Sequence, residues 1–204
     1  MMPPKPKFTR AEIVDAALSV ARRKGAAAVT TRDIGAVLGV STRPIFTYFV
    51  SMDEVRAAMR EAAQALYQNY IAEGLRMKIP FLGVGMQYIR FARSEPELYK
   101  MLFLAKDSDA LTGLESMQAQ ICASIMSIYN MDEPSALRFS HDMWLVVYGI
   151  SAMIVTGGCA YTDDEIRVML TGFSVAVCKA CKEVPGFVEN EIDRNAVFEK
   201  LIGE

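Results

Sequence analysis

The sequence predicts an all-α fold, and three of its features support this. Apolar residues recur three and four positions apart, which is the spacing of one helix face. Capping motifs, glycines and prolines divide the chain into segments of helical length, and no segment keeps the apolar–polar alternation of a strand. Because 52% of the 204 residues are apolar, such helices can bury a substantial core.

The first helix is predicted to begin after Thr9 and to end at Gly25. Thr9 and Glu12 have the spacing of a capping box, in which two backbone N–H groups of the first turn gain side-chain partners. Residues 1–7 contain two lysines and three prolines but no apolar run, so they predict an extended, solvated arm and not a signal peptide. This arm either reaches DNA or is a tail without a role.

Residues 30–49 predict two short helices joined by a turn. Thr30 is expected to cap the first helix together with Asp33, and Gly39 ends it because glycine accepts the left-handed conformation. Ser41 is expected to cap the second helix, and Pro44 suits its first turn, where no backbone N–H is needed. Taken alone, this pair fits a helix-turn-helix and an ordinary helical corner equally well.

Four side chains of the second helix are predicted to face outward. Ile45 and Phe49 are four positions apart and share the buried face, which leaves Thr42, Arg43, Thr47 and Tyr48 outside. In a helix-turn-helix the outer face of this helix enters the major groove of DNA.

Positive charge is concentrated in the first 60 residues. They contain ten basic and five acidic residues, a balance of +5, whereas the other 144 contain twelve and nineteen, a balance of −7; together these give the net charge of −2. A basic N-terminal end on an acidic protein favours an approach to phosphates, and favours DNA binding over a chance distribution of surface charge.

The remainder of the chain predicts further helices. Their expected ranges are 51–77, 81–93, 95–105, 109–129, 133–156 and 163–183, followed by a final short helix around 194–201. Ser94 and Thr162 are expected to cap two of them, because each begins a capping motif.

From Thr9 to about Val55 the chain resembles the TetR family of transcriptional regulators. The residues that match the family pattern are Arg10, Ile13, Ala16, Ala17, Gly25, Thr30, Thr31, Ile34, Gly39, Val40, Ser41, Phe46, Phe49 and Val55. The resemblance implies a DNA-binding domain at residues 1–50, formed by three helices with a helix-turn-helix, and an all-helical ligand-binding and dimerisation domain at residues 51–204. It implies a cytoplasmic homodimer that binds a palindromic double-stranded DNA operator and is released by a small apolar or amphipathic effector; an activator is the alternative to a repressor.

The resemblance also implies which residues contact DNA. Thr31 is expected to touch a phosphate, and the helix that begins near Thr42 is expected to enter the major groove. The chain departs from the family pattern by having Phe46 for Tyr, Tyr48 for His, Met52 for Lys and Arg43 for Gly. The predicted DNA-binding residues are Lys7, Thr31, Thr42, Arg43, Thr47 and Tyr48. Arg43 contacts either a guanine or a phosphate, and the missing hydroxyl at 46 and charge at 52 leave weakened DNA binding as the alternative.

Residues 143–162 contain no charge and reach the length of a transmembrane helix. Their three glycines and the flanking Asp142 and Asp163 argue against membrane insertion and favour burial against a second subunit. Trp144 and the Tyr148–Gly149 pair resemble a family pattern found at the dimer interface. The expected interface residues are Gly149, Ala152, Met169, Phe173 and Val177.

An apolar ligand pocket is expected on the same resemblance. Its candidate residues are Met86, Phe103, Met117, Trp144 and Tyr148, which are rich in Met and aromatic groups and serve equally well as plain core.

No enzyme, metal site or cofactor is expected. The single histidine, His141, excludes a site with two histidines, and its sequence neighbours Ser140 and Asp142 point in other directions on a helix. Cys178 and Cys181 lack a second cysteine pair, so they are expected to be buried structural residues, with a thiol sensor as the alternative.

Overall fold

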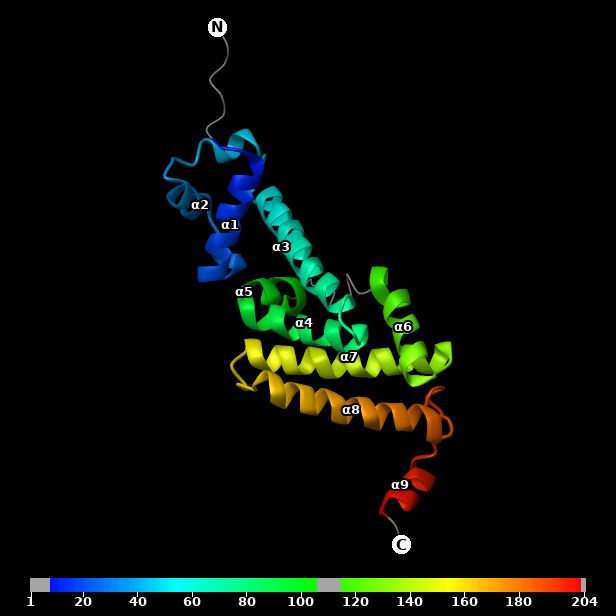
Figure 1. Ribbon diagram of the computed structural model, residues 1–204. Coiled ribbons are helices and arrows are strands. Elements are labelled where there is room, and N and C mark those ends of the chain that lie inside the picture. Colours follow the sequence, from blue (N-terminus) through cyan, green and yellow to red (C-terminus); the bar gives the residue numbers. More distant parts are fainter. Residues whose placement is uncertain (1–7, 106–114, 203–204) are drawn as a thin grey trace. The chain divides into compact units, whose positions relative to one another are not determined.

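A computed structural model describes residues 8–105 and 115–202, and all regular structure in these ranges is helical (Figure 1). The elements are α1 (Arg10–Lys24), η1 (Ala26–Ala28), α2 (Thr31–Leu38), η2 (Ile45–Thr47), α3 (Met52–Leu75), α4 (Pro80–Ser94), α5 (Pro96–Tyr99), η3 (Lys100–Leu104), α6 (Glu115–Tyr129), α7 (Glu133–Val155), α8 (Asp163–Glu183) and α9 (Arg194–Ile202). Here η1 and η2 are 3₁₀ turns and η3 is a π-helix. The predicted all-α fold is confirmed.

Capping motifs determine where several helices begin. The Thr9–Glu12 box starts α1 and the Thr162–Glu165 box starts α8, as predicted. The predicted cap at Ser94 is wrong, because Ser94 is the last residue of α4 and the α5 cap position is Glu95, which makes no side-chain cap bond. Pro96 explains the shift, since proline disfavours the helical conformation in the residue before it.

The chain packs as two compact units. The first comprises the chain up to Tyr70 and the segment from Arg90 through η3; the second comprises Ile71–Ile89 and the chain from α6 onward. Both α3 and α4 contribute residues to each unit. The division at residue 50 therefore stays a prediction.

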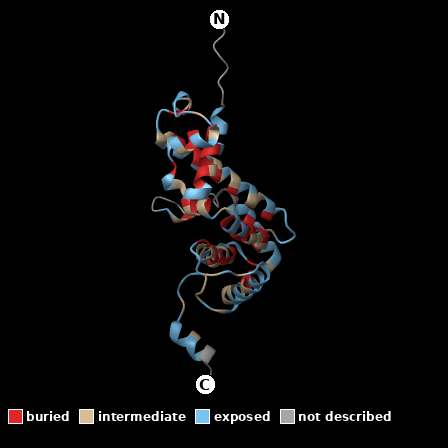
Figure 2. Ribbon diagram, turned by 90° about the vertical axis from the view of Figure 1, so that its left-hand side faces the viewer, coloured by how far each residue is buried: buried red, intermediate tan, exposed pale blue. Residues whose placement is uncertain are grey.

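Each unit has its own core, and Figure 2 shows the buried residues gathering on the inward helix faces. In the first unit, Tyr67 is fully buried and lies edge-on to Phe91 and Phe103, with ring centroids 5.5 and 5.0 Å away. In the second unit, α7 lies alongside α8 and also contacts α6 (Figure 1). Gly74 and Gly83 allow the backbones at the end of α3 and the start of α4 to approach closely, because a Cβ on Gly74 would lie 2.6 Å from the Gly83 carbonyl carbon.

The uncharged segment 143–162 does not form one continuous helix. Helix α7 ends at Val155, after which Gly157 adopts a left-handed φ of 78°. Within residues 8–105 and 115–202, no helix is long and apolar enough to cross a membrane.

Candidate nucleic-acid interface

The first helix of the predicted motif, α2, is attached to α1 at its N-terminal end. The Thr30 hydroxyl accepts the Asp33 N–H at 3.2 Å and donates to the Asp33 carboxylate at 2.7 Å. Lys24, the last residue of α1, places its Nζ 2.5 Å from the other carboxylate oxygen. The hydrogen bonds from Lys24 and then Thr30 lower the pKa of Asp33, so this carboxylate stays charged.

Two glycines form the turn after α2. Gly39 has φ 67° and ψ 34°, the left-handed conformation predicted for it. Gly35 is required for space, because a Cβ there would lie 2.8 Å from the Val40 carbonyl oxygen. The role of Gly35 was missed, although a glycine in the middle of a short helix signals a close backbone approach.

The second element of the motif is shorter than predicted. A helix capped by Ser41 from about Thr42 is wrong: η2 covers only Ile45–Thr47, and its cap position is Pro44, which makes no side-chain cap bond. The Ile45 N–H reaches the Thr42 carbonyl and the Tyr48 N–H reaches the Ile45 carbonyl, both at a separation of three residues. Because Pro44 has no N–H, it cannot contribute a helical bond at this point.

The side chains around η2 divide largely as predicted. Ile45 and Phe49 are buried, with exposures of 0% and 1%. Thr42, Arg43 and Thr47 are exposed together on this element. Thr31, at the first position of α2, is half-buried. Lys7 lies outside the described residues, and the DNA contacts of all these residues stay predictions.

Tyr48 is half-buried, in contrast to its predicted outer position. Its hydroxyl donates to the backbone carbonyl of Phe8 at 2.6 Å. Beside it, the Arg10 guanidinium lies 4.8 Å from the Phe49 ring centroid. The start of α1 therefore packs against the end of the η2 segment, which no local pattern indicated.

The other end of α1 is attached to α5. Arg22 makes two hydrogen bonds to Glu95, from Nε at 2.7 Å and from Nη2 at 2.9 Å. This pairing, above all its hydrogen bond, raises the pKa of Arg22. The two residues are 73 positions apart, so the sequence pattern did not identify this contact.

The predicted pocket residues lie in both units. In the second unit, Met86, Trp144 and Tyr148 are half-buried, and Trp144 lies edge-on to Tyr88 with centroids 4.5 Å apart. Phe103 is buried in the aromatic core of the first unit. Met117 lies in α6, and its side chain is outside the described part.

One buried polar residue of the second unit was not predicted. Gln87 is only 8% exposed, and its amide nitrogen donates to Glu73 at 3.1 Å. Among the described residues, its carbonyl oxygen has no hydrogen-bond partner. A buried acceptor without a partner has an unfavourable desolvation cost, so a donor at this position would be stabilising.

The outer surface of α7 and α8 is apolar. Exposed large apolar side chains there are Leu137, Leu145, Met153, Val168, Phe173 and Val175. A Cβ on Gly149 or Gly172 would meet no atom within 4 Å. Of the other predicted interface residues, Ala152, Met169 and Val177 are half-buried.

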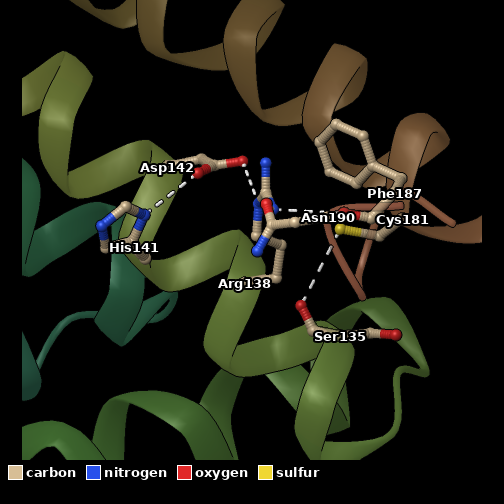
Figure 3. Close-up of polar contacts among 7 residues, drawn as sticks. All are labelled: Ser135, Arg138, His141, Asp142, Cys181, Phe187 and Asn190. Carbon is tan, nitrogen blue, oxygen red and sulfur yellow. Dashed lines mark hydrogen bonds and ion pairs between the residues drawn. The ribbon is translucent and has the colours of Figure 1, made fainter. Parts of the chain in front are cut away.

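A polar cluster holds the segment after α8 against α7 (Figure 3). Arg138 pairs with Asp142 at 2.7 Å, donates to the Phe187 carbonyl and to Asn190, and stacks on the Phe187 ring. His141 is a helix-surface residue, as expected, and contacts Asp142 at 3.1 Å.

The two cysteines of α8 are half-buried instead of buried. Cys181 donates to the Ser135 carbonyl, and burial raises the pKa of its thiol (Figure 3). A raised thiol pKa reduces the thiolate population and hence reactivity, which favours the structural role. Within the described ranges, no three His, Cys, Asp or Glu side chains gather as a metal site requires.

Comparison with known proteins identifies both parts of the chain. A family model described as bacterial regulatory proteins, tetR family, matches residues 13–59. A second model, described as tetracyclin repressor-like, C-terminal domain, matches residues 81–172. Together the two matches cover more than half of the 204 residues. No curated protein matches the chain.

Proposed function

Because the chain belongs to the TetR family of DNA-binding transcriptional regulators, a family without enzymatic activity, we propose that it is a homodimeric repressor released from its operator by a small molecule. The observation that carries the proposal is the exposed group Thr42, Arg43 and Thr47, presented on η2 directly after the Gly39 turn. Two hydroxyls and a guanidinium are suited to hydrogen-bond base edges and phosphates.

The dimer half of the proposal rests on the outer face of α7 and α8. Leu145, Gly149 and Ala152 follow at spacings of four and three on α7, and Val168, Gly172 and Val175 do so on α8. Each set therefore forms one helix stripe. The stripes combine exposed apolar groups with glycines that touch nothing in their own chain, which favours close packing against a second copy. Two heads related by a twofold axis would bind two half-sites of a palindrome.

The effector half rests on polar and aromatic groups of the second unit. The Gln87 carbonyl oxygen is buried without a partner, and Trp144 and Tyr88 supply aromatic surface. A molecule with an apolar body and one N–H or O–H donor matches this combination. We propose Met86, Gln87, Trp144 and Tyr148, with Phe103 and Met117, as the residues to test for effector binding.

The experiment is fluorescence anisotropy of the purified protein on the DNA flanking its own gene, against a scrambled duplex, at two salt concentrations. Selective binding that weakens steeply with salt supports the proposal. Equal and feeble binding to both duplexes contradicts an operator in that region.

A second candidate function is a small-molecule-binding dimer with weakened DNA contact. Phe46 is 51% exposed but has no hydroxyl, and Met52 has no charge, so neither can donate to a phosphate. This candidate predicts weak binding with little salt dependence.

A further inference from the structure

The hydrogen bond between Tyr48 and Phe8 joins the end of the η2 segment to the residue where α1 is about to begin. The Tyr48 hydroxyl lies 2.6 Å from the Phe8 carbonyl oxygen, although the residues are 40 positions apart. The next residue, Thr9, caps α1. The backbone is therefore held on both sides of the Phe8–Thr9 peptide.

This bond determines what the Tyr48 hydroxyl can offer to DNA. A phenol has one proton to donate, and here it is donated to a backbone carbonyl. The oxygen retains only lone pairs, whereas the phosphate oxygens of DNA are themselves acceptors. In this arrangement Tyr48 cannot donate a hydrogen bond to a phosphate.

The residue held by Tyr48 is the attachment point of the basic segment 1–7, which contains Lys5 and Lys7. Consecutive Cα atoms are about 3.8 Å apart, so the position of Phe8 limits where the lysine next to it can lie. The exposed residues Thr42, Arg43 and Thr47 belong to the same short segment as Tyr48. The bond thus fixes the base of the basic segment beside the proposed DNA-binding surface.

We propose that Tyr48 is a positioning residue that acts on DNA through the N-terminal segment: by holding Phe8, it directs Lys5 and Lys7 toward the phosphates next to the site that η2 occupies. This inference rests on the proposed function. It assigns to Tyr48 a role distinct from the direct DNA contact that the family resemblance implies.

A double-mutant cycle tests the proposal. Tyr48→Phe removes only the hydroxyl, and Lys5→Ala with Lys7→Ala removes the charges that it positions. On a labelled duplex from the region flanking the gene, Tyr48→Phe is expected to weaken binding by about fivefold or more, because ordering one backbone residue has a free-energy cost of that size. The lysine variant is expected to lower the salt slope by about 0.9 for each phosphate that it no longer neutralises.

The combined variant gives the decisive result. If Tyr48 acts through the lysines, Tyr48→Phe has no further effect once both are alanine. Effects that multiply, or a Tyr48→Phe protein that binds like the wild type, overturn the inference. Tyr161→Phe removes the same hydroxyl from the second unit and serves as the matched control.

Limited trypsin digestion tests the anchor without DNA. Trypsin cleaves after Lys7, whereas Pro6 protects the bond after Lys5. Releasing Phe8 by Tyr48→Phe is expected to speed cleavage at Lys7–Phe8 severalfold, with an unchanged melting temperature and unchanged cleavage elsewhere. An unchanged rate at this bond overturns the anchor. A wild-type protein that binds no DNA overturns the proposed function and the DNA role of Tyr48, and the cleavage rate then still decides whether Tyr48 holds Phe8.

Discussion

Replacing Gly35 by alanine tests whether close packing inside the head defines the turn. An added Cβ would lie 2.8 Å from the Val40 carbonyl oxygen, and ordinary contacts begin near 3.4 Å, so the turn must open by about 0.6 Å. Overpacking of this kind costs about 1–3 kcal/mol. The gain from replacing glycine in a helix is about 1 kcal/mol. We therefore expect a net loss of about 1 kcal/mol, the low end of this balance.

The assay is urea unfolding followed by circular dichroism, together with thermal melting. A loss of 1 kcal/mol corresponds to a fall of about 2–4 °C for a chain of this size. The control is Ala36→Gly at the adjacent exposed position, which measures helix propensity in the same helix. A Gly35→Ala protein that is more stable than the wild type would refute the reasoning, because propensity alone would then decide the sign.

The other predictions concern the interface, the dimer and pH. Arg43→Ala is expected to weaken specific DNA binding by about 1–3 kcal/mol and to relax preference at one operator position if Arg43 contacts a base; a uniform loss across sequences identifies a phosphate contact instead. Gly149→Leu should halve the mass measured by light scattering, because the new side chain meets nothing in its own chain but separates the proposed partners; an unchanged mass removes Gly149 from the interface. The lowered pKa of Asp33 stabilises the head above the pKa of an unfolded aspartate, and this contribution is lost as the pH falls through the lower folded value. Asp33→Asn should therefore reduce the loss of stability between neutral and acidic pH, and an unchanged pH profile of unfolding would contradict this.

Most helix positions could be predicted because their determinants are local. Thr9 with Glu12, and Thr162 with Glu165, form capping bonds over three residues. Gly39 ends α2 through its own conformation. Such interactions lie within one turn, so the spacing of residue types identifies them.

The parts that the sequence did not predict depend on long-range contacts or on competing local effects. Nothing around Tyr48 indicates a bond to Phe8, and nothing around Arg22 indicates Glu95, because these partners meet only in the folded unit. The short η2 was missed for a local reason: the missing N–H of Pro44 suits the first turn of a helix but equally limits this segment to three-residue bonds.

The contacts of α1 explain how such a short element as η2 can present side chains in a fixed orientation. A single 3₁₀ turn has little stability of its own, so its position must come from what surrounds it. Phe8, immediately before α1, accepts the Tyr48 hydrogen bond, and Arg10 in its first turn stacks on Phe49, so the residues that follow η2 are held by the start of α1. Near its other end, α1 is held by Arg22 on Glu95. The orientation of the exposed η2 side chains therefore follows α1, and α1 in turn is fixed by α5 within the same compact unit.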